Sequence, residues 1–140
     1  MIYVLAALKS GDEVLLIRRY NAAFGDGLYS LVGGKLESGE TALQAIKREV
    51  AEEVALDIAE SAFTLVHTLH RKGTQEEFIA LCFTADITTL HPTNNEPDKH
   101  DDMRFFSMDA LPANMVPAHE QVLKAIASGR NYSEHGWSIE

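Results

Sequence analysis

The chain has 140 residues, of which 46% are hydrophobic and 24% are charged, and its formal net charge is −9. This length and apolar content are typical of one folded domain spanning residues 1–140, and they exclude a disordered or fibrous chain. The negative charge opposes binding to polymeric nucleic acid or to an anionic membrane. No apolar run approaches the ~18 residues of a membrane span, and the apolar start lacks the basic region of a signal peptide. We therefore expect a cytoplasmic protein without a membrane partner.

The lone cysteine excludes an internal disulfide framework and a zinc cluster built from cysteines. Cys82 has apolar neighbours on both sides, which indicates a buried strand position. We expect it to be structural.

Short strands are expected in the first part of the chain. Residues 2–8 and 14–19 are rich in β-forming residues and are separated by a polar turn containing Gly11, which is typical of a hairpin. After a glycine-containing loop, residues 28–32 form a short strand that ends at Gly33 and Gly34.

The strongest helix signal spans residues 41–54. Leu43, Ile46, Val50 and Val54 recur at the spacing of one helical face, and Thr41 stands where it can cap the first turn. This helix therefore presents an apolar stripe to a core.

The second half of the chain alternates strands with a final helix. We expect strands over 63–70, 78–84 and 104–107, a loop over 88–102, a connector over 109–117, and a helix over 118–128 closed by Gly129. Residues 129–140 form a tail, in which Tyr132 and Trp137 are expected to pack without a special role. The order predicts an α/β (α+β) fold in which a mixed β-sheet lies between helices.

Three carboxylates gather on the first helix. Glu49, Glu52 and Glu53 are related as i, i+3 and i+4, so they share one face beside the apolar stripe. Like charges at this spacing weaken a helix, whereas a hard divalent cation such as Mg²⁺ would turn the repulsion into binding. The simpler interpretation, an acidic face exposed to solvent, does not explain the residues that accompany these glutamates.

Those residues stand at fixed distances from the glutamates. Glu40 lies at the start of the helix, Gly33 and Gly34 supply backbone groups before it, and Arg48 directly precedes Glu49. A backbone carbonyl from the glycines could complete a metal site, and the guanidinium could orient a carboxylate or neutralise phosphate.

This stretch resembles the signature of the Nudix hydrolases: Gly, five residues, Glu, seven residues, then Arg-Glu-aliphatic-x-Glu-Glu-x-Gly-aliphatic. Residues 34–56 match eight of its nine specified positions. Ala55 replaces the late glycine, and Val32 stands where many members have proline. Neither departure removes a ligand. Outside residues 34–56, which we call the Nudix box, the spacing resembles the MutT-like branch over most of residues 1–128.

The resemblance implies a Nudix-like α/β/α sandwich that hydrolyses nucleoside diphosphates linked to another moiety X, with Mg²⁺ or Mn²⁺ and water as the nucleophile. The metal-binding positions correspond to Glu49, Glu52, Glu53 and the carbonyl of Gly33, and Arg48 belongs to the same catalytic set. The general base is either Glu49 or an acid of the later loop, which contains Glu96, Asp98, Asp101 and Asp102, with the last two favoured. The resemblance also makes a homodimer one expected assembly.

The candidate substrate-binding residues resemble the family pattern to different degrees. Arg18 resembles a phosphate contact; Lys35, Arg71 and Lys72 are weaker candidates for the same role. His119 stands where the MutT-type pattern has a base-reading asparagine, so it is expected to contact the substrate while changing the base that is read. His67 and His70 are expected to be structural or exposed.

Three functions follow as hypotheses. The first is pyrophosphate hydrolysis of a nucleoside triphosphate, with an ADP-sugar or dinucleoside polyphosphate as the nearest alternative substrate. The second is a non-catalytic, nucleotide-binding regulatory module, which would be expected to have lost box residues. The third is a structural domain with a metal-free acidic helix.

Overall fold

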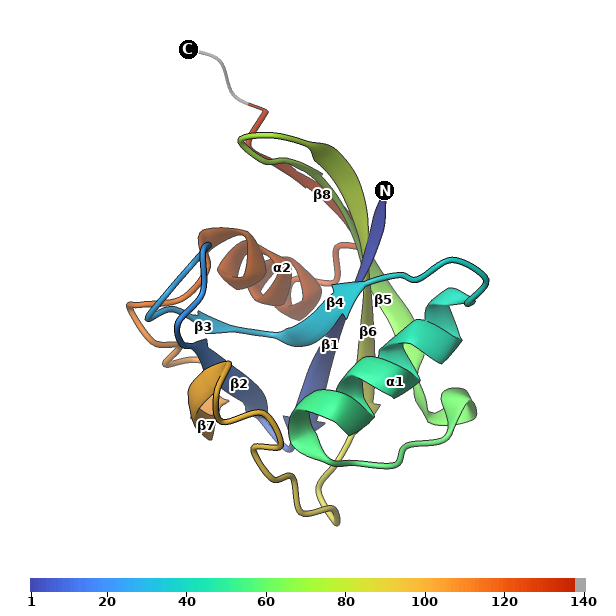
Figure 1. Cartoon of the computed structure of the whole chain (residues 1–140), viewed down its shortest axis with the longest axis vertical. Coiled ribbons are helices and arrows are strands. Elements are labelled where there is room, and N and C mark those ends of the chain that lie inside the picture. Colours follow the sequence, from blue (N-terminus) through green and yellow to red (C-terminus); the bar gives the residue numbers. More distant parts are fainter. Residues whose placement is uncertain (138–140) are drawn as a thin grey trace.

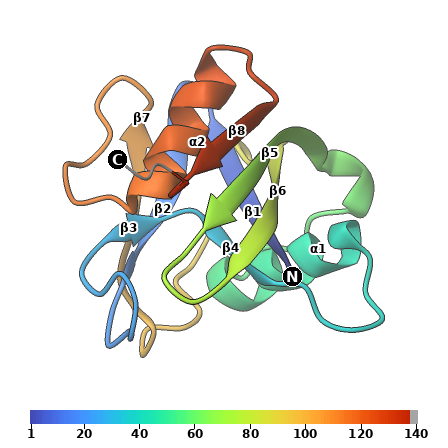
Figure 2. The same cartoon turned by 90° about the horizontal axis from the view of Figure 1, so that it is seen from above.

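The computed structural model describes residues 1–137. Across these residues the chain forms one mixed sheet of eight strands, two α-helices and a 3₁₀ turn. Figures 1 and 2 show α1 and α2 on opposite sides of the sheet, which confirms the expected sheet between helices. The elements are β1 (Ile2–Ser10), β2 (Glu13–Arg19), β3 (Tyr29–Ser30), β4 (Val32–Lys35), α1 (Ala42–Val54), η1 (Glu60–Ala62), β5 (Thr64–Lys72), β6 (Glu77–Asp86), β7 (His100–Ser107), α2 (Pro117–Ala127) and β8 (Tyr132–His135).

The first strand organises the sheet, whose order is β3-β2-β1-β6-β5-β8. β1 runs parallel to β6 and antiparallel to both β2 and β4, while β7 adds to β2. β4 pairs with the first half of β1, with Val4 opposite Gly34 and Leu5 opposite Gly33. The two glycines thus lie inside the sheet, next to its central strand.

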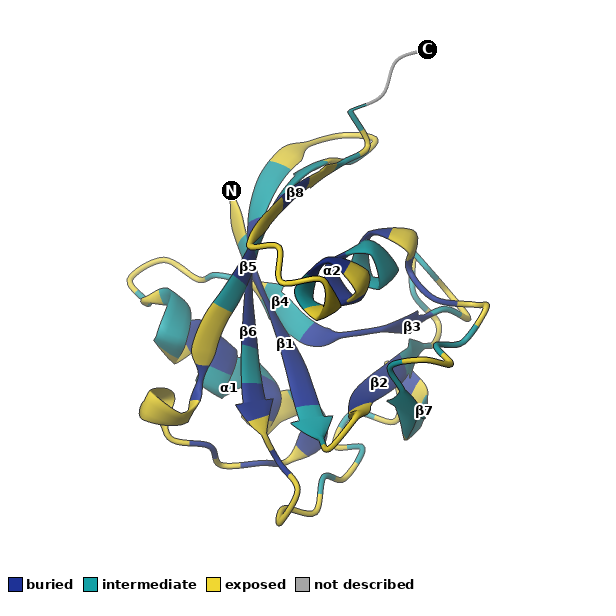
Figure 3. Cartoon of the chain, turned by 180° about the vertical axis from the view of Figure 1, so that it is seen from behind, coloured by how far each residue is buried: buried dark blue, intermediate teal, exposed yellow. Residues whose placement is uncertain are grey.

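The core has one layer on each face of the sheet. Alternate residues of β1 point to opposite faces, as the pleat of a strand requires. Val4, Ala6 and Leu8 pack with Ile46 and Val50 of α1. Leu5 and Ala7 pack with the buried side of α2. Figure 3 shows β1 and β2 as mostly buried, whereas β5 and β6 also carry intermediate and exposed residues. Burial on both faces therefore fixes the register of β1 and holds both helices.

The ends of α1 explain its position. The Thr41 hydroxyl accepts a hydrogen bond from the Gln44 N–H at 3.1 Å, and the Gln44 side chain accepts one from the Thr41 N–H at 2.9 Å. This capping box confirms the expected start. The helix closes at Ala55, which has φ 59° and ψ 36° in the left-handed region. Ala55 thus replaces the glycine of the Nudix signature at a position whose backbone conformation favours glycine.

Two sequence-based boundaries need correction. The strand expected over 28–32 is two strands, β3 and β4, because Ser30 pairs with β2 whereas Val32 pairs with β1. Gly33 and Gly34 consequently lie within β4 and do not end a strand. The loop expected to reach residue 102 stops before His100, since residues 100–107 pair with β2 along its whole length.

The tail contains a strand that the sequence did not predict. β8 runs parallel to the edge of β5. The buried side chain of His67 reaches the Ser133 hydroxyl through Nε2 at 2.7 Å and the Arg130 carbonyl through Nδ1 at 2.8 Å. The Trp137 indole N–H donates to the His70 carbonyl at 3.0 Å. His67 is therefore structural, as expected, and it anchors the tail.

Two further expectations concern burial and membranes. Cys82 is 1% exposed within β6, and burial raises the pKa of its thiol to about 12, as expected for a structural cysteine. Within residues 1–137, neither α-helix combines the length and the apolar composition needed to span a membrane.

Candidate functional site

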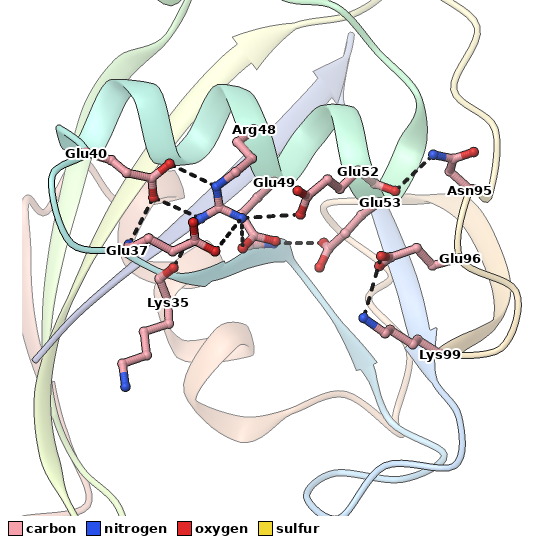
Figure 4. Close-up of polar contacts among 11 residues, drawn as sticks. Lys35, Glu37, Glu40, Arg48, Glu49, Glu52, Glu53, Asn95, Glu96 and Lys99 are labelled. Atoms are coloured by element: carbon pink, nitrogen blue, oxygen red, sulfur yellow. Dashed lines mark hydrogen bonds and ion pairs between the residues drawn. The ribbon is translucent and has the colours of Figure 1, made fainter.

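Arg48 is the centre of a polar cluster on α1 (Figure 4). Its Nε and Nη2 donate to the two carboxylate oxygens of Glu40, each at 2.9 Å. Its Nη1 donates to Glu49 at 3.0 Å and to Glu52 at 3.2 Å. Nη2 also reaches the Lys35 carbonyl at 3.3 Å. The guanidinium therefore holds the helix carboxylates against the loop that leads into α1.

Glu40 is the strongest partner in this cluster. The hydrogen bonds from Arg48, together with the backbone N–H of Glu37, lower the pKa of Glu40 to about 2. The same contact with Glu40 raises the pKa of Arg48. This fork-to-fork pairing fixes the planar guanidinium in one orientation, which a lysine could not do.

Glu49 and Glu53 form a second, more buried pair. Burial raises the pKa of Glu49, although Arg48 opposes that rise. Burial also raises the pKa of Glu53 well above its usual value, with the neighbouring Glu49 as the next cause. Glu53 also accepts the Gly33 N–H at 3.1 Å. Each carboxylate thus disfavours ionisation of the other, and the pair binds protons more readily than free carboxylates do.

Strand β4 makes room for this pair. A Cβ atom on Gly34 would come within 2.6 Å of the Glu49 carboxyl carbon, and a Cβ on Gly33 would meet the backbone of β1. Gly34 thus leaves space for the Glu49 carboxyl group, and Gly33 allows β4 to lie close to β1. The structure shows the Gly33 N–H in contact with the pair, whereas the sequence-based expectation concerned its carbonyl.

The later acidic loop docks on the end of α1. Asn95 reaches back through its N–H to the Glu53 carbonyl and through its side chain to the Glu52 carbonyl, both at 3.1 Å. Glu96 adds to the negative field at Glu53 and lies 3.6 Å from Lys99. The favoured loop acids are engaged elsewhere: Asp101 pairs with Arg18 at 2.7 Å, and Asp102 pairs with Arg104 at 2.8 Å and accepts the Tyr29 hydroxyl. Glu96 is therefore the loop acid whose charge raises the pKa of Glu53.

A cleft of about 390 Å³ opens beside the same glycines. Gly33 and Gly34 belong to its wall, together with the aromatic rings of Phe24 and Phe78. Its volume and mixed lining are typical of small-molecule sites. The carboxylates of α1 and a ligand-sized cleft thus both border strand β4.

The predicted substrate contacts divide into two groups. His119 lines the cleft, and its Nδ1 accepts the Leu31 N–H at 3.1 Å. Burial and the positive charges of Arg71 and Arg19 lower the pKa of His119 to about 3, so the ring is neutral. Arg71, a weaker candidate, also lines the cleft. Arg18 and Lys35 are not part of its wall; Arg18 is held by Asp101.

The sequence did not single out Arg19, Phe24 or Phe78. Arg19 follows a bulge in the pairing of β2 with β7, after which its side chain reaches the Phe24 carbonyl at 2.7 Å and joins the cleft wall. The sequence contains two consecutive arginines at the end of a strand, whose side chains point to opposite faces. Which face borders the cleft depends on the tertiary structure, so the sequence could not select Arg19.

The donor chemistry of the cluster fits a hard divalent cation. Carboxylate oxygens are the ligands that Mg²⁺ and Mn²⁺ favour, and a cation would offset the repulsion between Glu49 and Glu53. Within residues 1–137, no three Asp, Glu, His or Cys side chains converge as a finished ligand set. Arg48 instead contacts both Glu49 and Glu52.

Comparisons with known proteins identify the family of the chain. The NUDIX domain model matches residues 2–126. The NAD-capped RNA hydrolase NudC of Pseudomonas aeruginosa (strain LESB58) is 32% identical over 125 residues, covering 86% of this chain and 40% of that protein. An ADP-ribose pyrophosphatase of Methanocaldococcus jannaschii is 27% identical over 124 residues, covering 89% and 71%. The chain thus spans about two fifths of the length of the NudC relatives it matches.

Solved structures show the same fold. The crystal structure of a MutT NUDIX hydrolase from Burkholderia pseudomallei superposes with a TM-score of 0.80 and 27% identity, covering 88% of this chain and 95% of that one. The agreement spans the sheet and both helices that position the cluster and the cleft.

Proposed function

The chain belongs to the Nudix hydrolase family, and from that premise we propose that it hydrolyses the pyrophosphate linkage of a nucleoside diphosphate joined to a further group X, with a divalent cation and water. Nucleoside triphosphates fall within this class. Residues 1–140 act as a single domain in this proposal, with the catalytic box at about residues 34–56.

The observation that carries the proposal is the Glu49–Glu53 pair. Two partly buried carboxyl groups lie next to each other, against glycines that also line a ligand-sized cleft. Such an arrangement is unfavourable for a purely structural helix, because burying like charges raises the free energy of the folded state. In a cation-binding site, the bound cation offsets this repulsion between the carboxylates.

The residues have distinct roles in this proposal. Glu49, Glu52, Glu53 and the backbone of Gly33 would hold Mg²⁺ or Mn²⁺. When bound, such a cation neutralises phosphate oxygens and lowers the pKa of an attacking water. Arg48 holds Glu49 and Glu52 in place through its Nη1 atom. Glu49 accepts the proton of the water as general base, with Glu96 of the docked loop as the alternative.

The substrate binds in the adjoining cleft. His119 presents a neutral ring there, and Phe24 and Phe78 offer flat apolar surfaces. The relatives' names include an ADP-ribose pyrophosphatase and an oxidized purine nucleoside triphosphate hydrolase, so both X-linked diphosphates and triphosphates are candidates. The net charge of −9 favours a small metal-bound nucleotide over polymeric nucleic acid, in keeping with a cytoplasmic enzyme.

A panel of nucleotides tests this function. The purified chain is incubated with nucleoside triphosphates, ADP-sugars and dinucleoside polyphosphates, with Mg²⁺ or with a chelator, and the products are identified. Monophosphate with pyrophosphate indicates triphosphate cleavage, whereas two monophosphate products indicate an X-linked diphosphate. Loss of turnover on chelation is expected. Absence of turnover across the panel would contradict the enzymatic proposal and favour a binding module.

Variants then test the assigned residues. Glu52→Gln and Glu53→Gln are each expected to lower turnover by about a hundredfold or more, because a carboxylate ligand is lost. Glu60→Gln makes the same change at an exposed residue of η1 and is the matched control. Rates near those of the wild type in both site variants would refute the metal assignment.

A further inference from the structure

The cleft beside the glycines contains two arginines that face the same space. Arg19 lies over the Phe24 ring at 5.7 Å from its centroid, and Arg71 lies over the same ring at 5.3 Å. Arg71 is also 5.6 Å from the centroid of Phe78. Two strands that are far apart in the sheet order, β2 and β5, therefore direct their cations at one aromatic wall.

Neither cation has an acidic partner. Among residues 1–137, Arg18, Arg48 and Arg104 each pair with a carboxylate, whereas Arg19 and Arg71 have no carboxylate oxygen within 4.0 Å. Glu76 is the acid in the cleft wall; it is exposed and contacts the Tyr3 hydroxyl at 3.5 Å. In a chain with a net charge of −9, two half-buried guanidinium groups without counter-charges are an unusual arrangement.

The electrostatics of the cleft agree with this geometry. Burial lowers the pKa of Arg71, and the charge of Arg19 lowers it further. Arg19 and Arg71 therefore form a local region of positive charge in the cleft, in which the two cations repel each other.

His119 extends the set of donors. Its Nδ1 accepts the Leu31 N–H, so the proton of the neutral ring is on Nε2. It stands in the first turn of α2, whose dipole is positive at that end. The polar side chains of Arg19, Arg71 and His119 thus offer donors and no acceptors to a ligand.

We propose that this cleft is an anion subsite that selects substrates carrying a phosphate or carboxylate group in addition to the pyrophosphate that is cleaved. The inference rests on the proposed function for the identity of the substrate, but the subsite itself does not require catalysis. Arg71 and Arg19 are its specificity-determining residues, because guanidinium groups bind carboxylate and phosphate oxygens through paired hydrogen bonds.

Binding of inorganic phosphate to the metal-free protein tests the subsite apart from hydrolysis. In the presence of a chelator, NMR titration with phosphate is expected to shift the signals of Arg19, Arg71 and Leu31. Arg71→Gln and Arg19→Gln are each expected to weaken binding about tenfold, since a charged hydrogen-bond partner is lost. Arg71→Lys retains the charge and is expected to lose less.

The control is Arg130→Gln, which removes the same charge from an exposed arginine outside this cleft. Binding that is absent in the wild type, or that is the same in the Arg71→Gln and Arg130→Gln proteins, would overturn the subsite. This result would leave the proposed hydrolysis unaffected, because the chelated protein is not turning over substrate.

Two matched substrate pairs identify the source of the anion. A nucleoside diphosphate hexose is compared with the corresponding hexuronate, which adds a carboxylate to X. An ADP-sugar is compared with its 3′-phosphorylated form, which adds a phosphate to the nucleoside. The wild type is expected to favour the charged member of one pair by at least about tenfold in kcat/KM, and Arg71→Gln should bring that ratio close to one. Ratios near one in the wild type, or an unchanged ratio in the variant, would refute the proposal.

Discussion

Gly34 and Glu49 are fitted to each other: the carboxyl group of Glu49 occupies the space that a side chain on Gly34 would need. The contact joins the sheet to the helix that carries the acidic cluster. A Cβ atom on Gly34 would meet the Glu49 side chain, whereas a Cβ atom on Gly33 would meet the backbone of β1. The two glycines are therefore required for different reasons.

Substituting these glycines is expected to have different effects. Gly34→Ala should displace the Glu49 carboxyl and lower turnover about a hundredfold, as misplacement of a reacting group by about an ångström does, while the fold adapts. Gly33→Ala should lower the free energy of unfolding by about 1–3 kcal/mol, because the Leu5 Cα would lie only 2.9 Å from the new atom. Turnover and urea unfolding of both variants distinguish the cases. Equal destabilisation by the two changes would contradict this distinction.

The low pKa of His119 predicts how stability depends on pH. Its folded value is about 3, below the ordinary value of 6.5, so between these values the unfolded chain binds a proton that the folded chain does not. The free energy of unfolding should therefore fall as the pH is lowered from about 6.5 towards 3. His119→Asn should reduce this slope by up to about 1.4 kcal/mol per pH unit.

Urea unfolding at several pH values measures the slope. The same substitution at His91, an exposed loop residue, is the matched control. A His119→Asn protein with the wild-type slope would show that the ring does not titrate in this way.

The left-handed backbone at Ala55 indicates that a glycine there would stabilise the fold. Its left-handed backbone costs an alanine about 1–2 kcal/mol, and a glycine adopts it without that cost. Ala55→Gly is therefore expected to raise the free energy of unfolding by about 1 kcal/mol. Ala51→Gly, in the exposed interior of α1, should lower it by about the same amount. Thermal and urea unfolding test both signs, and a decrease for Ala55→Gly would contradict the conformational argument.

The contacts of Trp137 with β5 are expected to stabilise the β5–β6 hairpin, which borders the cleft. Its ring lies 4.6 Å from the His70 ring, and its N–H binds the His70 carbonyl. Trp137→Ala should speed amide exchange in residues 71–78 about tenfold, with little change in the central strands. Tyr132→Ala removes another tail aromatic, which is 47% exposed, as a control. Uniform acceleration over the whole chain would indicate global destabilisation.

The sequence predicted the elements whose signals are local. The apolar stripe and cap of α1 and the hairpin of β1 and β2 were recognised close to their observed bounds, because spacing and turn residues determine them. The division of residues 28–32 into β3 and β4 was missed, since it depends on which partner each half finds. β8 was missed for the same reason: four mostly polar residues become a strand through β5 and His67.

The candidate site shows the same contrast. The carboxylates, Arg48 and the glycines were identified because they lie at fixed spacings in one stretch of chain. The cleft is assembled from β1, β2, the β2–β3 loop, β4, β5, β6 and α2, so its composition depends on tertiary structure. Arg18 and Arg19 are consecutive residues that point to opposite faces of β2, and the tertiary structure determines which face borders the cleft.

β8 also affects how the molecule behaves among its own copies. Without it, the outer N–H and C=O groups of the nine-residue β5 would be open to pairing with another chain. The four-residue β8 leaves a much shorter free edge, so the tail protects the sheet from edge-to-edge association while contributing nothing to the acidic cluster. A chain truncated before residue 131 would keep every residue of that cluster and still be prone to aggregate.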